Sequence, residues 1–343
     1  MKILITGAAG FIGSYLVNYF NNKNHTIYGI DNLSRNGSKY NLEKLQKLKK
    51  FKFFKIDVTD KKKLDYFFKK NKFDVIFHLA AQVSLIDSVY NPRFDMNENF
   101  IGTFNLLECL RMYNKRAKFV YSSTNKVFGD LKELKILKNN KNFRFKDLKK
   151  GINEDYPIKF CGPYGCSKGS AESYVVDYSK VYGLKTYSLR KSCIYGTNQF
   201  GMEAQGWVSW LIIASLLKKQ IYVYGDGNQA RDLLHVDDLA KLYEKIAKNK
   251  YKKENCILNA GGGEKNILSV NQILNYLTEN LILDKKIKYS KIRPADQKLY
   301  YTDITKAKKV FKWYPKIKAW SGVNKMMQFY LKNNNLLKNI YKK

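Results

Sequence analysis

The chain has 343 residues and a formal net charge of +34, and 45% of its residues are hydrophobic and 15% aromatic. This composition excludes a disordered chain, and the length accommodates one large α/β domain with a smaller appended lobe. No apolar run reaches the roughly 18 residues of a membrane span. The apolar run in the opening MKILITGAAG is too short for a signal peptide, which would also need a cleavage site of small residues. We therefore expect a cytoplasmic protein with no membrane partner.

The basic charge comes almost wholly from lysine, since the chain has 55 lysines and eight arginines. Protein surfaces that bind nucleic-acid phosphates favour arginine, because its planar guanidinium group can form two hydrogen bonds to one phosphate. Here the excess is lysine, and it is spread along the whole length of the chain. We interpret the charge as compositional drift of an enzyme surface, with weak, salt-sensitive binding of polyanions as a by-product. No specific nucleic-acid partner is expected.

The five cysteines are scattered and have no tight pairing, and the chain has only three histidines. A zinc site normally combines closely spaced cysteine pairs with a second pair or with histidines. We expect reduced, structural thiols and no metal site. The cysteines are Cys109, Cys161, Cys166, Cys193 and Cys256.

Short β-branched or aromatic runs alternate with helical patterns in the first half, which predicts a doubly wound parallel Rossmann-type α/β sheet. The expected strands are Lys2–Thr6, Thr26–Asp31, Lys52–Lys55, Val75–His78, Phe119–Ser122 and Lys185–Leu189. The expected helices are Phe11–Asn21, Lys61–Lys70, Phe94–Tyr113 and Tyr164–Val181.

The remaining segments set the expected domain division. Leu131–Lys150 is rich in lysine and asparagine without a period, and it indicates a surface loop. After Lys191 the pattern loosens into glycine-rich turns and short elements. We predict a dinucleotide-binding domain over 1–190, a smaller substrate-binding lobe over 191–337 with segments returning to the main domain, and a frayed basic tail over 338–343.

A glycine-rich turn follows the first strand and opens the first helix, which is the context of a dinucleotide fingerprint. Its glycines allow a pyrophosphate to approach the helix N-terminus. Asp31 ends the second strand, where a carboxylate accepts hydrogen bonds from ribose hydroxyls and repels a 2′-phosphate, so we expect NAD. Arg35 is the one nearby feature that favours NADP. The expected cofactor residues are Gly7, Gly10, Phe11, Ile12, Gly13, Asp31, Asn32, Asp57, Val58, Leu79, Ala80, Ala81, Gln82, Asn99, Tyr164 and Lys168.

Tyr164 and Lys168 lie four residues apart on one face of a predicted helix. A cation beside the phenol, together with a positively charged nicotinamide, lowers the pKa of the phenol and prepares it to take a proton from a sugar hydroxyl. The alternative is a simple surface pair. Thr124 ends a preceding strand, where its hydroxyl can bond the reacting oxygen.

These residues resemble the extended short-chain dehydrogenase/reductase family, through GAAGFIG, HLAAQV, SSTNKVFGD, YGCSK, YGDGNQARDLLHVDDL, NAGGG and RPADQ. The motifs run in order from residue 1 to about 315. The resemblance implies an enzyme that binds NAD and acts on a nucleotide sugar, in a homo-oligomer. It assigns Tyr164 as acid and base, Lys168 as the residue that lowers its pKa and holds the nicotinamide ribose, and Thr124 as the residue that orients the reacting oxygen.

Within the family, 4,6-dehydratases carry an Asp-Glu pair directly after this threonine, whereas this chain has Asn125 and Lys126. Several stretches instead resemble CDP-paratose 2-epimerase, among them CGPYGCSKGSAESYVVDY, GTNQFGMEAQGWVSW and RPADQKLYYTDITKA. That resemblance implies oxidation at C2 of the sugar and return of hydride to the opposite face, in the synthesis of a surface polysaccharide.

The resemblance also implies a set of substrate-binding residues, in which the two arginines clamp the diphosphate and nucleotide. For the arginines the alternative is a structural salt bridge, and for Trp207 and Tyr224 it is core packing. The subfamily has arginine where this chain has Asn198, which affects the choice of sugar, and His235 replaces a tyrosine that is common in the wider family. The expected set is Thr124, Gln199, Gln205, Trp207, Tyr224, Arg231, Arg293 and Gln297.

Two alternatives to the 2-epimerase stay open. One is a related 4-epimerase or reductase acting on another nucleotide sugar. The other is a non-catalytic protein that binds NAD or RNA, which the complete Thr124, Tyr164 and Lys168 set argues against.

Overall fold

The computed structural model describes residues 1–139, 142–249, 255–280, 282–283 and 287–342, and the chain divides into two compact units. The first unit contains residues 1–127, 162–190 and 242–258, and the second contains residues 128–161, 191–241 and 259–343. Residues 128–161 cluster with the second unit, which differs from the expected boundary at residue 190, whereas residues 242–258 return to the first unit, as was expected of some later segments.

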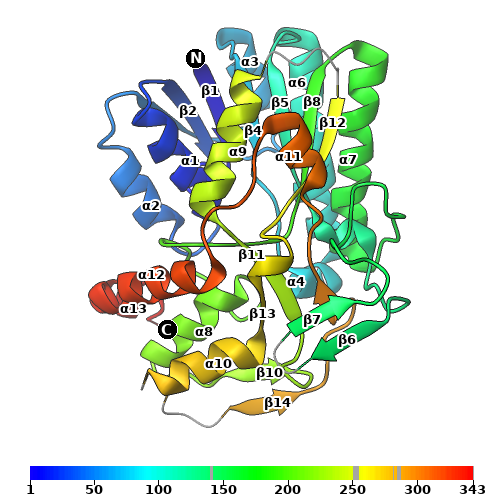
Figure 1. The fold of residues 1–343 in the computed structure, drawn as a ribbon. Helices are drawn as coiled ribbons and strands as arrows, with labels where there is room; N and C mark the ends of the chain where they lie inside the picture. The colour runs from blue at the N-terminus through cyan, green and yellow to red at the C-terminus, as the bar shows by residue number, and fades with distance from the viewer. Residues whose placement is uncertain (140–141, 250–254, 281, 284–286, 343) are drawn as a thin grey trace. The chain divides into compact units, whose positions relative to one another are not determined.

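The first unit is built on a seven-stranded sheet of order β12-β8-β5-β4-β1-β2-β3 (Figure 1). The register is parallel for β1 with β2 and β4, for β2 with β3, and for β4 with β5. The strand order reverses between β1 and β4, which is the position where doubly wound sheets bind ligands. The predicted fold class is confirmed. The strands are β1 (Lys2–Thr6), β2 (Thr26–Asp31), β3 (Phe51–Lys55), β4 (Val75–His78), β5 (Lys118–Thr124), β8 (Lys185–Lys191) and β12 (Asn255–Ala260).

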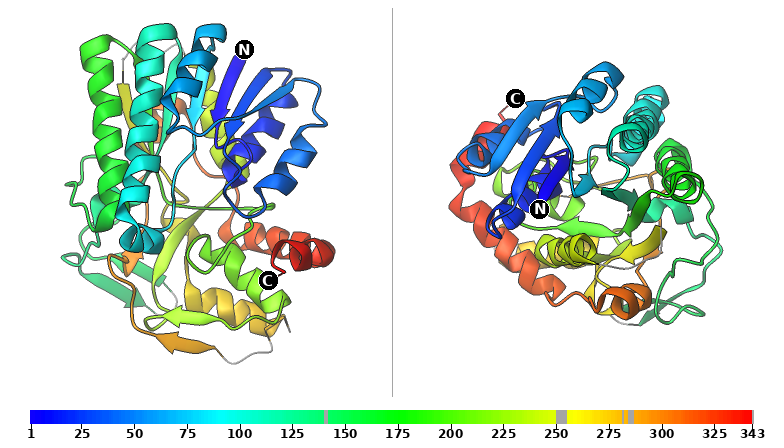
Figure 2. Two further views of the ribbon diagram at one scale, coloured as in Figure 1. Left: turned by 180° about the vertical axis from the view of Figure 1, so that it is seen from behind. Right: turned by 90° about the horizontal axis from the view of Figure 1, so that it is seen from above.

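Helices cover both faces of this sheet. A large apolar cluster lies under α3, α6 and α7, while α1 and α9 cover the other face, where Phe77 packs between Phe20 at 5.3 Å and Tyr243 at 5.0 Å (Figure 2). The helices are α1 (Phe11–Asn21), α2 (Ser38–Leu45), α3 (Lys61–Lys70), α4 (Leu85–Tyr90), α5 (Pro92–Met96), a π-helix (Asn97–Ile101), α6 (Gly102–Tyr113), the 3₁₀ turn Asn125–Phe128, α7 (Gly162–Tyr182) and α9 (Val236–Lys248).

The second unit contains short strands and helices. Its central strand β11 pairs in parallel with β9 and β15 and antiparallel with β13, and β10 pairs in parallel with β14. The strands are β6 (Ile136–Asn139), β7 (Asn142–Phe145), β9 (Cys193–Tyr195), β10 (Tyr222–Tyr224), β11 (Ala230–His235), β13 (Ile267–Ser269), β14 (Lys288–Ser290) and β15 (Leu299–Tyr300). The helices are α8 (Trp207–Leu216), the 3₁₀ turn Glu264–Asn266, α10 (Val270–Glu279), α11 (Thr305–Phe311), α12 (Ala319–Lys332) and α13 (Asn334–Ile340).

Three sequence-based expectations need correction. The single helix expected over Phe94–Tyr113 is three consecutive segments, α5, the π-helix and α6. The loop expected over Leu131–Lys150 contains the antiparallel hairpin β6–β7, which is anchored because Phe145 stacks on Tyr301 at 5.1 Å. The prediction of a frayed tail is wrong for residues 338–341. Helix α13 continues to residue 340, and the Tyr341 hydroxyl donates to the Gly201 carbonyl at 2.6 Å.

The described residues also bear on membrane and metal binding. In that part of the chain, no helix is both long enough and apolar enough to cross a membrane. The same residues contain no group of three or more histidine, cysteine or acidic side chains placed to hold a metal ion. All five cysteines are free thiols.

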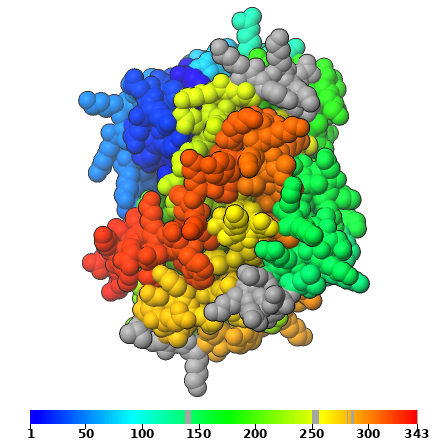
Figure 3. All heavy atoms as spheres, viewed as in Figure 1, coloured from blue at the N-terminus to red at the C-terminus, as the bar shows by residue number. Residues whose placement is uncertain are grey.

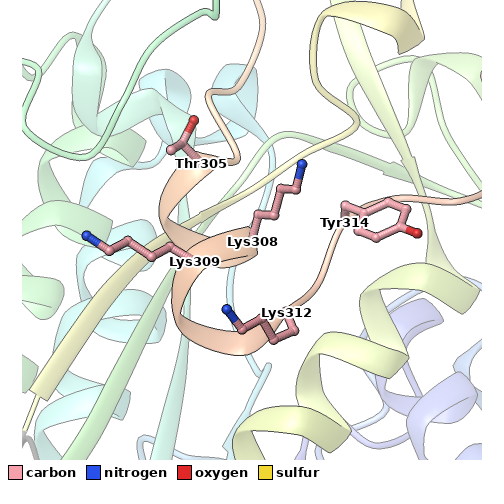
Figure 4. Close-up of a pocket in the computed structure, with 5 residues that line it drawn as sticks. All are labelled: Thr305, Lys308, Lys309, Lys312 and Tyr314. Atoms are coloured by element: carbon pink, nitrogen blue, oxygen red, sulfur yellow. The ribbon is translucent and has the colours of Figure 1, made fainter.

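A surface pocket lies along α11, which forms part of the face shown in Figure 3. Three lysines reach around it, and the walls are their methylene stems together with Thr305 and Tyr314 (Figure 4). No residue of the predicted catalytic, cofactor or substrate sets lines it. The lining residues are Thr305, Lys308, Lys309, Lys312 and Tyr314.

Candidate active site

The glycine-rich turn after β1 leaves no room for side chains. Gly7 has a φ of +66°, and a Cβ there would lie 2.8 Å from the Ala80 nitrogen. A Cβ on Gly13 would lie 2.0 Å from the Gly7 carbonyl oxygen. Helix α1 begins after Gly10, and no side chain caps this end. The turn therefore presents a helix N-terminus at which an anion can approach the backbone closely.

Acidic side chains follow β2 and β3 beside this turn. The buried Asp31 carboxylate accepts hydrogen bonds from the Ala9 amide at 3.0 Å and the Leu33 amide at 2.7 Å. Burial raises the pKa of Asp31, while these amides oppose the shift. Asn32 donates to Asp57 at 2.8 Å, and hydrogen bonds of this kind outweigh burial and lower the pKa of Asp57. The carboxyl ends of both strands are thus fixed in one polar cluster.

The end of β4 is held by a buried hydrogen-bond chain. The Thr6 hydroxyl accepts from the amides of Leu79 and Ala80, each at 3.1 Å, and contacts His78 Nδ1 at 2.7 Å. His78 Nε2 lies 2.9 Å from the Thr103 hydroxyl, and burial keeps the pKa of His78 well below its usual value. A neutral imidazole therefore positions the backbone that faces Gly7. Ala81 and Gln82 continue this segment.

Tyr164, on α7, and Thr124, at the end of β5, come together in the first unit. Burial raises the pKa of Tyr164 to about 12, the nearby Asp95 carboxylate adds to the shift, and the Thr124 hydroxyl and the Arg35 charge oppose it. The lowering of the phenol's pKa that is expected from Lys168 together with a bound nicotinamide stays a prediction. Arg35, considered above for a 2′-phosphate, interacts electrostatically with Tyr164 and with Asp87.

Lys168 lies one helical turn after Tyr164 and is buried, with its Nζ 4.2 Å from the centre of the Tyr121 ring. The Tyr121 hydroxyl donates to the Lys168 carbonyl at 3.1 Å. Beneath the helix, the Ser167 hydroxyl donates to the buried Asp95 carboxylate and accepts from the Asn99 amide at 3.1 Å. Asn99 lies in the π-helix, a geometry that often marks functional sites.

The first unit fits a dinucleotide in three respects. Its glycine turn admits a pyrophosphate, and the Asp31 carboxylate stands where a ribose would be bound. The third is Asn99, whose Oδ1 is buried without a hydrogen-bond partner among the described atoms. A buried polar atom of this kind is costly unless a ligand satisfies it.

The predicted substrate residues other than Thr124 all belong to the second unit. Arg231, on β11, donates to the Asp296 carboxylate at 2.8 Å and to the Gln297 and Ala230 carbonyls. The salt bridge considered as the alternative for Arg231 is therefore present. Its role toward a diphosphate stays a prediction.

Tyr224 and Arg293 lie in direct contact, with the guanidinium carbon 3.7 Å from the ring centre. The Tyr224 hydroxyl donates to the carboxylate of Glu203, a residue that sequence reasoning missed. No local signal marks Glu203, because its segment has no period and its partners come from distant parts of the chain.

Among the other predicted substrate residues, Gln199, Gln205 and Trp207 lie close to the start of α8, and Gln297 lies elsewhere in the second unit. Gln199 is buried, its amide donates to the Ile194 carbonyl at 3.1 Å, and its Oε1 has no partner among the described atoms. Asn198 has a φ of +63°, a conformation that asparagine adopts more readily than most residues. The remaining members are Gln205, Trp207 at the start of α8, and Gln297, which is fully buried and donates to the Gly129 carbonyl at 2.7 Å.

Comparisons with known proteins extend over nearly the whole chain. The GDP-mannose 4,6 dehydratase family model matches residues 4–326. A CDP-paratose 2-epimerase of Salmonella typhi is 37% identical over 95% of this chain and 98% of its own length. A putative UDP-glucose 4-epimerase of Methanocaldococcus jannaschii is 32% identical, over 97% of this chain and 99% of its own. The crystal structure of Thermus thermophilus UDP-glucose 4-epimerase in complex with NAD has a TM-score of 0.79 and 27% identity, with 96% of this chain and 99% of that chain covered.

Proposed function

Because this chain belongs to the GDP-mannose 4,6 dehydratase family of extended short-chain dehydrogenases/reductases, we propose that it is an NAD-dependent nucleotide-sugar epimerase of the CDP-paratose 2-epimerase type. The observation that carries the proposal is the pair Asn125 and Lys126 directly after Thr124. The family's dehydratases have an acid and a base there, whereas neither side chain of this pair is a carboxylate. The similarity to the Salmonella typhi epimerase supports the choice of C2.

The side chains of the first unit supply the proton chemistry. Tyr164 takes the proton from the sugar hydroxyl as the carbon is oxidised and returns it when the carbon is reduced. Thr124 orients the reacting oxygen, and Lys168 holds the nicotinamide ribose. NAD, when bound, accepts a hydride and contributes a positively charged ring. The residues that would hold it are the glycine turn, Asp31 and Asn99.

The side chains of the second unit would hold the nucleotide sugar. Arg231 and Arg293 would clamp the diphosphate and nucleotide, since guanidinium groups bind phosphates in a bidentate fashion. Gln199, Gln205 and Gln297 would line the sugar-nucleotide site with Trp207 and Tyr224. No reducing equivalent is consumed in this scheme.

A homo-oligomer in the cytoplasm is part of the proposal. Apolar side chains on α6 and α7 support the oligomer, because Met112, Tyr174, Val181 and Tyr182 are all more than a third exposed. Exposed apolar side chains gathered on two neighbouring helices are typical of a contact surface.

The direct test is to incubate the purified chain with CDP-paratose, without added NADH or NADPH, and to follow the configuration at C2 by NMR. We expect CDP-tyvelose to form until the two sugars reach equilibrium. Unchanged CDP-paratose together with 4-epimerisation of UDP-glucose would replace the assignment by the 4-epimerase that the Methanocaldococcus jannaschii relative favours. Turnover that requires stoichiometric NADH or NADPH would indicate a reductase.

In the Asp31→Asn variant the preference for NAD over NADP should fall by about tenfold or more. The reason is that the Asp31 carboxylate repels the 2′-phosphate of NADP, and the amide does not. Isothermal titration calorimetry with each dinucleotide measures the ratio of dissociation constants. The Asp65→Asn variant, in α3 of the same unit, is the control for a change in net charge, since Asp65 pairs with Lys61 at 2.7 Å and is not one of the predicted cofactor residues. An unchanged ratio in Asp31→Asn would show that Asp31 does not select the dinucleotide.

A further inference from the structure

Three separate segments of the second unit bring Glu203, Tyr224 and Arg293 together. Glu203 precedes α8, Tyr224 ends β10, and Arg293 follows β14. Because β10 and β14 are parallel neighbours, the residues after both strands lie side by side, and the Gly225 amide donates to the Ser290 carbonyl at 2.9 Å.

The contacts within this trio fix the Glu203 carboxylate. It accepts a hydrogen bond from the Tyr224 hydroxyl. An Arg293 nitrogen lies 3.9 Å from the carboxylate and donates to the Glu203 backbone carbonyl at 3.1 Å. The Glu203 side chain is nevertheless 38% exposed, whereas that of Arg293 is 20% exposed. The carboxylate is therefore held in place and is open to a ligand.

An ionised carboxylate only accepts hydrogen bonds, so a ligand edge that meets Glu203 must donate one. Cytosine carries an exocyclic amino group at the position where uracil and thymine carry a carbonyl oxygen. A carboxylate is a recognised acceptor for that amino group. A uracil carbonyl oxygen in the same place would face the Glu203 carboxylate, and neither group could donate a hydrogen bond to the other.

We propose that Glu203 is the residue that selects the base, favouring cytosine nucleoside diphosphates over uracil ones, with the base stacked on Tyr224. This inference rests on the proposed function, in which Tyr224 and Arg293 line the nucleotide site. Arg293 positions the Glu203 carboxylate and packs against the Tyr224 ring. The hydrogen bond from the Tyr224 hydroxyl keeps this carboxylate beside the edge of the Tyr224 ring.

The test compares CDP and UDP binding to the full chain by isothermal titration calorimetry. We expect the parent chain to bind CDP on the order of 10- to 100-fold more tightly than UDP. In Glu203→Gln the amide can either accept or donate, so this ratio should fall to within about threefold of one. The control is Glu279→Gln, an exposed carboxylate at the end of α10 in the same unit, which should keep the parent ratio.

Each outcome decides the inference. Equal binding of CDP and UDP by the parent chain, or an unchanged ratio in Glu203→Gln, would overturn it while leaving a nucleotide-sugar enzyme intact. No binding of either diphosphate by the parent chain would remove the proposed function as well. NAD binding, measured on the same samples, shows whether each variant is folded.

Discussion

The Tyr164→Phe variant should interconvert its nucleotide sugar about 100- to 10,000-fold more slowly than the parent chain. The phenol is the one proton carrier of the catalytic set, and phenylalanine keeps its ring while removing the transferable proton. The measurement is kcat/KM from the NMR assay.

The control for this substitution is Tyr174→Phe, which removes a hydroxyl from the same helix at a position that is 42% exposed. It should keep the parent rate within about twofold. NAD affinity should be similar in the parent and in both variants, since the glycine turn and Asp31 are untouched. A parent-like rate in Tyr164→Phe would show that another group transfers the proton.

Strong local patterns made parts of the first unit predictable from sequence. Strands β1, β2 and β4 and helices α1 and α3 have their expected bounds, because a run of buried residues or an amphipathic face defines each of them. The side chain of Asp60 also accepts from the Lys63 amide at the start of α3. Helix α2 was missed because it is short and polar and begins after Gly37, at a φ of +77°.

Features that depend on tertiary contacts could not be predicted. The division of Phe94–Tyr113 into α5, the π-helix and α6 is not visible in the periodicity of hydrophobic residues. It coincides with the hydrogen bonds that the Asn99 side chain donates to Asp95 and Ser167. The raised pKa of Tyr164 is also tertiary, because burial and the charges of distant residues set it. Residue types and spacing thus pointed to the proposed catalytic set and left its electrostatics open.

The same contrast holds for the substrate set. Resemblance to the family pointed to Arg231 and Arg293, since both lie in motifs. Their partners Asp296 and Glu203 were not expected, because an ion pair between segments 65 or 90 residues apart has no sequence period. Glu203 is therefore a residue that only the structure could reveal.

The Glu172→Gln variant should lower the free energy of unfolding by about 3–5 kcal/mol. Glu172 on α7 accepts two hydrogen bonds from Arg190 on β8, at 2.9 and 2.7 Å, and a third from Ser188 at 2.7 Å. Both charged side chains are only 3% exposed. A neutral amide would remove the counter-charge that Glu172 supplies to the buried Arg190 guanidinium, and urea denaturation measures the loss.

The surface offers a matched pair as a control. Glu108 on α6 accepts from Arg111 through two bonds of 2.8 Å, but these side chains are 28% and 34% exposed. Because water already screens this pair, Glu108→Gln should cost only about 0–1 kcal/mol. Replacing both Glu172 and Arg190 by methionine should recover much of the stability, since the two buried charges of this pair are then removed together. If Glu172→Gln costs no more than Glu108→Gln, the desolvated pair is not what joins α7 to the sheet.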